Sequence, residues 1–129
     1  MSQNGFTLIE IIAVLIILGV LAAFAVPKYM DMENQARIKA AQSAIAEVRS
    51  RLSYGYAKYQ IDNNGNFPGS ILAICTHLND DTILPANGNG DVAVGSDFKV
   101  TLGTDGTITV THVDGAALTP PETGIWAVP

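Results

Sequence analysis

Cysteine is nearly absent from this sequence, and its scarcity limits the available chemistry. Cys75 is the one cysteine among 129 residues, so no internal disulfide and no site of several cysteines can form. With His77 and His112 as the two histidines, no metal-ligand spacing, nucleophilic-serine motif or phosphate-binding loop is present. We therefore expect no enzymatic activity and no cofactor, and we interpret Cys75 as a small buried apolar residue.

Basic residues are also scarce. Seven Lys and Arg against 12 Asp and Glu give a net charge of −5 and a pI near 4.7, which argues against a nucleic-acid partner. Through Lys58 the chain has six basic and four acidic residues, but from Tyr59 onward it has one basic and eight acidic. This division is consistent with a solvated acidic surface or with electrostatic complementarity between neighbouring copies.

One long hydrophobic run dominates the N-terminal part. Phe6–Val26 is a stretch of 21 residues whose polar side chains are Thr7 and Glu10. A helix of this length extends about 30 Å, enough to cross the hydrocarbon core of a bilayer. A chain with one domain could not surround so apolar a helix, and Met1–Gly5 lacks the positive charge of a secretory signal. The run therefore predicts a membrane-spanning helix.

Glu10 is the anomaly in this run, because ionisable side chains in membrane segments are costly and usually functional. Near a helix start, a carboxylate can reach the interface and meets a favourable helix dipole. Glu10 is thus either an interfacial acid at the helix start or a carboxylate that awaits a positive partner.

The segment Gly5–Glu10 (GFTLIE), followed by the apolar run and Pro27, resembles the leader junction of a type IV prepilin. The resemblance implies that residues 1–5 are a leader peptide and that prepilin peptidase cleaves between Gly5 and Phe6. It also implies N-methylation of the new amine of Phe6. The leader departs from the usual pattern, since it contains no Lys or Arg.

The same resemblance implies roles within the apolar helix. The Glu10 carboxylate would pair with the N-terminal amine of a neighbouring subunit, Phe6, and so guide assembly. Pro27 is expected to kink the helix near Ala23. In related filaments a similar Gly-to-Pro interval loses helical order on assembly, which would make Gly19 and Pro27 the limits of a flexible stretch. An ordinary kink at the membrane exit is the alternative.

Beyond Pro27 the pattern becomes amphipathic and predicts that one helix continues to about Gln60. Residues 6–27 would form its transmembrane and assembly half and residues 28–60 its amphipathic half. Seven apolar residues fall within roughly an 80° arc at 100° per residue, namely Ile38, Ala41, Ile45, Val48, Leu52, Tyr56 and Tyr59. Tyr29 and Tyr54 fall on the opposite side.

Residues 61–129 are predicted to add loops, a short helix and an antiparallel sheet. Apolar spacing indicates a helix near 71–78, and alternation indicates a hairpin of residues 98–102 and 107–111, with a third strand at 125–128. Trp126 would be either a core residue or part of a surface contact. The prediction is an α+β fold of the type IV pilin kind, with residues 28–129 as one globular domain.

We expect no metal site, and a calcium site among four aspartates is the alternative. Asp80, Asp81, Asp91 and Asp97 provide oxygen ligands without a recognised calcium-loop spacing, and major pseudopilins of secretion systems use such an ion. An acidic, soluble loop surface is the simpler interpretation.

The resemblance predicts a structural subunit that forms a homo-oligomeric helical filament, a type IV pilus supporting adhesion or motility. Ala25–Tyr29 and Asp31–Arg37 are similar to the mannose-sensitive haemagglutinin group, although the C-terminal disulfide loop of typical pilins is missing. The expected partners are prepilin peptidase and the inner-membrane assembly machinery, with the bacterial inner membrane occupied before assembly and the cell surface after it. A pseudopilin of a type II secretion system is the alternative.

Overall fold

A 55-residue helix, α1 (Leu8–Asp62), is the longest element of the computed structural model, which describes residues 5–78 and 90–129. The helix begins at Leu8 rather than Phe6 and ends at Asp62 rather than Gln60, and it continues through Pro27. The chain divides into two compact units, Met1–Ala36 and Arg37–Pro129, and α1 contributes to both. We call the second unit the head. The predicted boundary between residues 27 and 28 stays a prediction.

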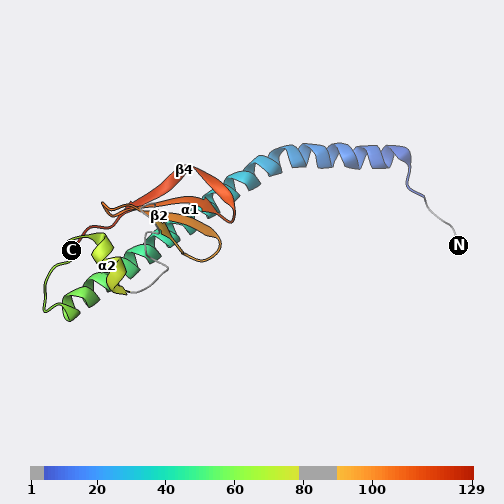
Figure 1. Cartoon of the computed structure of the whole chain (residues 1–129). Helices are drawn as coiled ribbons and strands as arrows, with labels where there is room; N and C mark the ends of the chain where they lie inside the picture. Colours follow the sequence, from blue (N-terminus) through green and yellow to red (C-terminus); the bar gives the residue numbers. More distant parts are fainter. Residues whose placement is uncertain (1–4, 79–89) are drawn as a thin grey trace. The chain divides into compact units, whose positions relative to one another are not determined.

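The head combines α1 with a short helix and a four-stranded sheet (Figure 1). Helix α2 spans Ile71–Leu78, as the apolar spacing predicts. The strands are β1 (Asp91–Val92), β2 (Phe98–Leu102), β3 (Thr107–Val113) and β4 (Ala116–Ile125). They pair antiparallel in the order β1-β2-β3-β4. The predicted α+β fold, a long N-terminal helix with a small antiparallel sheet, is confirmed.

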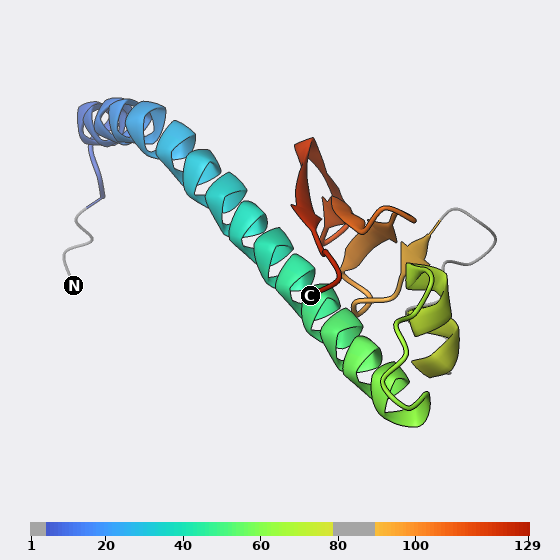
Figure 2. The same ribbon diagram turned by 90° about the vertical axis from the view of Figure 1, so that its left-hand side faces the viewer.

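One core joins α1, α2 and the sheet. Figure 2 shows the sheet beside the part of α1 that belongs to the head, with α2 near its C-terminal end. Of the predicted apolar stripe, Ile38 and Tyr59 are half-buried, whereas the other five residues are buried. The seven largest fully buried side chains come from all three parts of the head, namely Leu52, Ile74, Ile108, Val48, Val100, Val110 and Cys75. The interpretation of Cys75 as a buried apolar residue is confirmed.

Trp126 belongs to this core. Its side chain is 5% exposed, its ring lies edge-on to that of Tyr56 at 6.2 Å, and its Nε1 donates a hydrogen bond to Ser53 Oγ at 3.0 Å. A buried indole needs a partner for its N–H group, and Ser53 provides one. The C-terminal segment is therefore tied to the C-terminal third of α1.

The prediction of a third strand at residues 125–128 is wrong. The third long strand is β4, and it ends at Ile125. The sequence pattern does not indicate β4, because the strand contains Pro120 and Pro121. Proline cannot donate to a sheet ladder and therefore weakens a strand assignment. Here β4 is an edge strand, and the ladder with β3 is irregular between Val110 and His112, so both prolines are tolerated.

Gly55 is a point of close packing between α1 and α2. This buried residue of α1 lies so close to α2 that an added Cβ atom would stand 2.6 Å from Leu78 Cδ1 and 2.7 Å from Ile74 Cγ2. Glycine in a helix costs about 1 kcal/mol relative to alanine. The close approach of the two helices explains why it is present.

Replacing Gly55 with valine is expected to destabilise the head by about 1–3 kcal/mol, because overpacking forces core side chains or helices to shift. Urea unfolding of the full chain in mild detergent, followed by the fluorescence of Trp126, measures the change in free energy. Ala57→Val is the control, since Ala57 lies on the exposed side of the same helix. Valine has a higher helix propensity than glycine, so without overpacking Gly55→Val would not be destabilising. No loss of stability in Gly55→Val would therefore contradict the close packing of α2 on Gly55.

Candidate functional site

The start of α1 is organised by Thr7 and Glu10. The Thr7 backbone N–H and hydroxyl each donate to Oε2 of Glu10 at 3.3 Å, and the Glu10 backbone N–H donates to Thr7 Oγ1 at 3.3 Å. This reciprocal arrangement is a capping box, in which the two side chains satisfy backbone donors that a helix start leaves unpaired. Thr7 is therefore the N-cap of α1, and Glu10 completes the capping box within its own chain.

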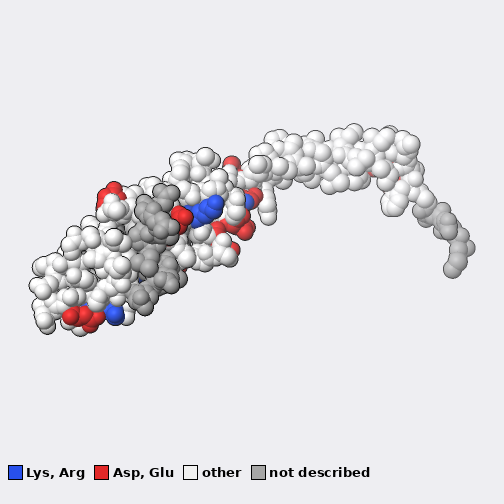
Figure 3. Space-filling view, viewed as in Figure 1, with Lys and Arg blue, Asp and Glu red and all other residues white. Residues whose placement is uncertain are grey.

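The capping box does not explain why the apolar side chains that follow it on α1 are exposed. Phe6, Leu8 and Ile9 are 81%, 78% and 73% exposed, and the large apolar side chains onward to Val26 are also exposed. On the face drawn in Figure 3, the N-terminal part of α1 shows almost no charged atoms. This helix is long and apolar enough to cross a membrane, and none of its most apolar 18-residue window is buried. Such a surface requires a lipid or protein environment.

The other residues to which the prepilin resemblance assigns a role lie either in the exposed segment before α1 or within the helix. Gly5 and Phe6 are exposed and precede α1. Gly19 has no neighbouring atom within 4 Å of an added Cβ, so packing within the chain does not require glycine there. The interval from Gly19 to Pro27 is helical, and its loss of helical order on assembly stays a prediction.

The sequence interpretation did not recognise the role of Thr7. A threonine followed by a glutamate three residues later, just before an apolar run, is the signature of a capping box and could have identified it. In the sequence Thr7 counts only as one of two polar residues in the apolar run, whereas in the structure it holds Glu10.

Replacing Thr7 with valine is expected to lower hydrogen-exchange protection in the first turn of α1 by about fivefold, because loss of a capping hydroxyl costs about 1 kcal/mol. The measurement compares full-length variants in the same detergent. Thr7→Ser retains the hydroxyl and should preserve the protection. Equal protection in the valine and serine variants would contradict a capping role for this side chain.

The calcium prediction receives no support from the described residues. Asp91 and Asp97 are exposed, and Asp97 Oδ1 accepts a hydrogen bond from Ser96. Asp80 and Asp81 lie outside the described residues. Within residues 5–78 and 90–129, no group of three His, Cys, Asp or Glu side chains could hold a metal ion, and the calcium site stays an untested alternative.

The pKa values of two other titratable side chains, Cys75 and Asp105, are shifted for structural reasons. Burial raises the pKa of the Cys75 thiol, which disfavours the reactive thiolate. Hydrogen bonds from the Thr107 backbone N–H and hydroxyl, at 3.0 and 2.8 Å, lower the pKa of Asp105 below its usual range. These contacts stabilise the turn between β2 and β3 and form no reactive pair.

The fold and the N-terminal segment together define a pilin-like protein: an exposed apolar helix with a glutamate in its first turn, attached to a small α+β head. Residues 1–26 match the family model of the prokaryotic N-terminal methylation motif. This match covers the predicted cleavage junction and the whole apolar run.

Relatives come from both secretion systems and pili. The chain is 43% identical over 62 residues to the type II secretion system core protein G of Pseudomonas aeruginosa, covering 48% of this chain and 41% of that protein. It is 42% identical over 60 residues to the type IV narrow pilus major component PilA5 of Thermus thermophilus, covering 46% and 50%. A fimbrial protein of Pseudomonas aeruginosa is 39% identical over 49 residues, covering 38% and 32%.

These matches confirm the resemblance to the type IV pilin family. The chain spans about half the length or less of these curated relatives, and no solved structure matches it. The matched proteins are named as components of a pilus, fimbriae and a secretion system. The motif and the apolar helix together support membrane association.

Proposed function

We propose that this chain is a structural subunit that polymerises through its N-terminal helix into a type IV pilus. The observation that carries the proposal is the exposed apolar surface of α1 with one carboxylate, Glu10, in its first turn. In the unassembled subunit lipid covers this surface, and in the filament the helices of neighbouring subunits cover it. The pilus would support adhesion or motility at the cell surface.

Maturation precedes assembly in this proposal. Prepilin peptidase cuts between Gly5 and Phe6 at the inner membrane, and the new amine of Phe6 is N-methylated. The exposure of both residues and the match to the methylation motif support this step. The product has a positive charge at Phe6, near the carboxylate of Glu10.

Glu10 then changes partners. In the single chain its carboxylate accepts hydrogen bonds from neutral donors of Thr7. In a helix bundle, the amine of Phe6 from a neighbouring subunit is a charged donor, which makes a stronger bond in an apolar environment. An unpaired charge there is heavily penalised, so the pair sets the register between subunits.

The second candidate function is a pseudopilin of a type II secretion system. The match to a core protein G of such a system, the relative with 43% identity, favours it specifically. Both functions use the same processing and the same pairing of Glu10, and they differ in the length and location of the fibre.

Deleting the chain from its native host distinguishes the two functions. Loss of sheared surface filaments with normal protein secretion supports the pilus, and retained filaments with secreted proteins trapped in the periplasm support the pseudopilin. Complementation with the unaltered chain is the control. If neither phenotype appears, both proposals are contradicted.

A further inference from the structure

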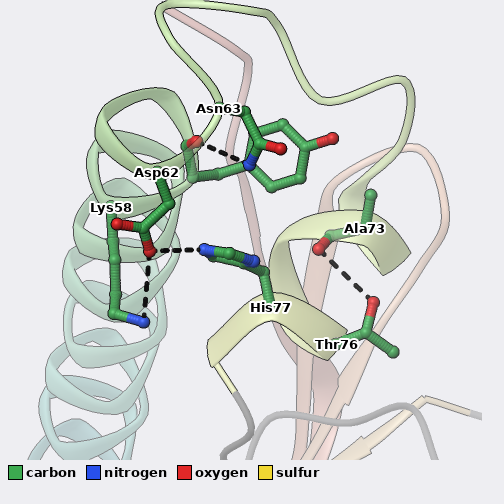
Figure 4. A network of polar contacts seen from close by, with 7 residues as sticks. Lys58, Asp62, Asn63, Ala73, Thr76 and His77 are labelled. Atoms are coloured by element: carbon green, nitrogen blue, oxygen red, sulfur yellow. Dashed lines mark hydrogen bonds and ion pairs between the residues drawn. The ribbon is translucent and has the colours of Figure 1, made fainter.

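The two helices of the head meet in side-chain contacts at the C-terminal end of α1. Asn63 Nδ2 donates to the Tyr59 backbone oxygen at 2.9 Å and so caps this end of the helix (Figure 4). Nε2 of His77 on α2 lies 2.8 Å from Oδ2 of Asp62, and the ammonium group of Lys58 lies 3.6 Å from the same oxygen. The polar groups shown at this end of the helix thus have partners within the chain.

The sheet is different, because the edge of a sheet presents backbone N–H and C=O groups that can pair with a strand of another chain. Strand β1 lies at one edge and has two residues. The ten-residue strand β4 lies at the other edge (Figure 1) and pairs with β3 alone among the described strands. β4 is therefore the longer edge along which a second copy could add a strand.

Two adjacent prolines stand in the middle of this edge. Pro120 and Pro121 are exposed. The segment Leu118–Pro121 lies opposite a single residue of β3, Thr111, and regular pairing with β3 continues on either side. Because this segment bulges out of the ladder, the prolines remove no hydrogen bond from the pairing with β3.

The prolines instead change the outer edge of β4. In a regular strand, successive residues direct their N–H groups alternately to the two neighbouring strands, so one of two adjacent prolines stands where an outward N–H would be. Proline has no N–H group, and its ring carbon occupies the place of the hydrogen. The outer edge is therefore divided into two short parts, residues 116–119 and 122–125.

A second copy is the partner that this arrangement excludes, because every chain presents the same edge. Two identical strands pair most extensively about a two-fold axis, in which each copy uses the same surface. An antiparallel pair of β4 strands over their full length would place Pro120 of one copy opposite Pro121 of the other. Such a pair would lack hydrogen-bond donors at its centre.

We propose that Pro120 and Pro121 block strand pairing between the heads of two copies, so that chains do not associate through their sheets. Without the prolines the edge would favour such pairing, since Thr119, Thr123 and Ile125 are exposed and are residues that favour strands. Prolines, bulges and short strands are the means by which sheet edges are protected from pairing in general. Association of copies is thereby left to other surfaces of the chain.

Threonine in place of the prolines tests the block, because it restores an N–H group and favours strands. Pro120→Thr, Pro121→Thr and the double variant are compared with the unaltered full chain in the same mild detergent. Sedimentation measures self-association, and urea unfolding followed by Trp126 fluorescence shows whether the head is folded. We expect the double variant to associate about tenfold more tightly, a change that a few net hydrogen bonds supply.

Hydrogen exchange identifies the surface that is involved. Protection of residues 116–125 should rise with chain concentration in the double variant and stay constant in the unaltered chain. Adding Thr119→Lys to the double variant should reverse the association, since a charged side chain on an edge opposes pairing. Pro129→Thr is the matched control, because it makes the same replacement at an exposed proline outside the sheet and should leave self-association unchanged.

Four results would overturn the proposal. They are concentration-dependent protection of β4 in the unaltered chain, no increase in association of a folded proline variant, an increase that Thr119→Lys does not reverse, and an equal increase in Pro129→Thr. If all three proline variants lose the folded head, the prolines serve the fold and the proposal fails as well. The outcome does not depend on filament formation.

Discussion

Replacing Glu10 with glutamine is expected to abolish filament formation while the chain remains in the membrane. Glutamine can still serve as the third-position residue of a capping box, so the contacts with Thr7 can persist. The charge is lost, and the amine of a neighbouring Phe6 would be buried without a counter-charge. Removing one partner of a buried ion pair costs about 3–5 kcal/mol, more than 100-fold in association at each contact.

Glu10→Ala and Glu10→Val should fail in the same way, since neither supplies a carboxylate. The measurement is the amount of subunit in sheared filaments relative to the amount in membranes. Asp31→Asn is the matched control, because it removes an exposed acid of α1 outside the apolar run and should still assemble. Normal filaments from Glu10→Gln would mean that capping, and not charge pairing, is the role of this residue.

Replacing Leu52 with alanine is expected to destabilise the head by about 2–5 kcal/mol, the range for large-to-small substitutions in a core. Leu52 is 0% exposed and lies on the face of α1 that packs in the head core. The free energy of unfolding is measured by urea titration in mild detergent with Trp126 fluorescence. Since Trp126 is the one tryptophan and is buried in the head, its signal reports this unit alone.

Ile61→Ala provides the comparison, because Ile61 lies on the same helix but is 79% exposed. A surface substitution of this kind changes stability by about 0.5 kcal/mol or less. Equal effects of the two substitutions would contradict the placement of the apolar stripe of α1 in the core.

Much of the fold was predictable from local patterns. Helix periodicity placed Leu52 and Tyr56 in the core, and α2 and the hairpin of β2 and β3 follow from apolar spacing and alternation. The candidate site at Glu10 was predictable because one charge in an apolar run has few explanations, and the motif around it is specific.

Other features depend on tertiary contacts that local patterns do not contain. β4 was missed because Pro120 and Pro121 interrupt its pattern, and only an edge position allows them. Gly55 gives no signal in the sequence until α2 is known to cross it. The partner of His77 lies on another helix, 15 residues away in the sequence.

The most direct test of the central claim is mass spectrometry of filaments sheared from the cell surface. The account predicts that the assembled chain begins with N-methylated Phe6, with residues 1–5 removed. Assembled chains that still begin with Met1, or filaments that contain no copy of this chain, would contradict it.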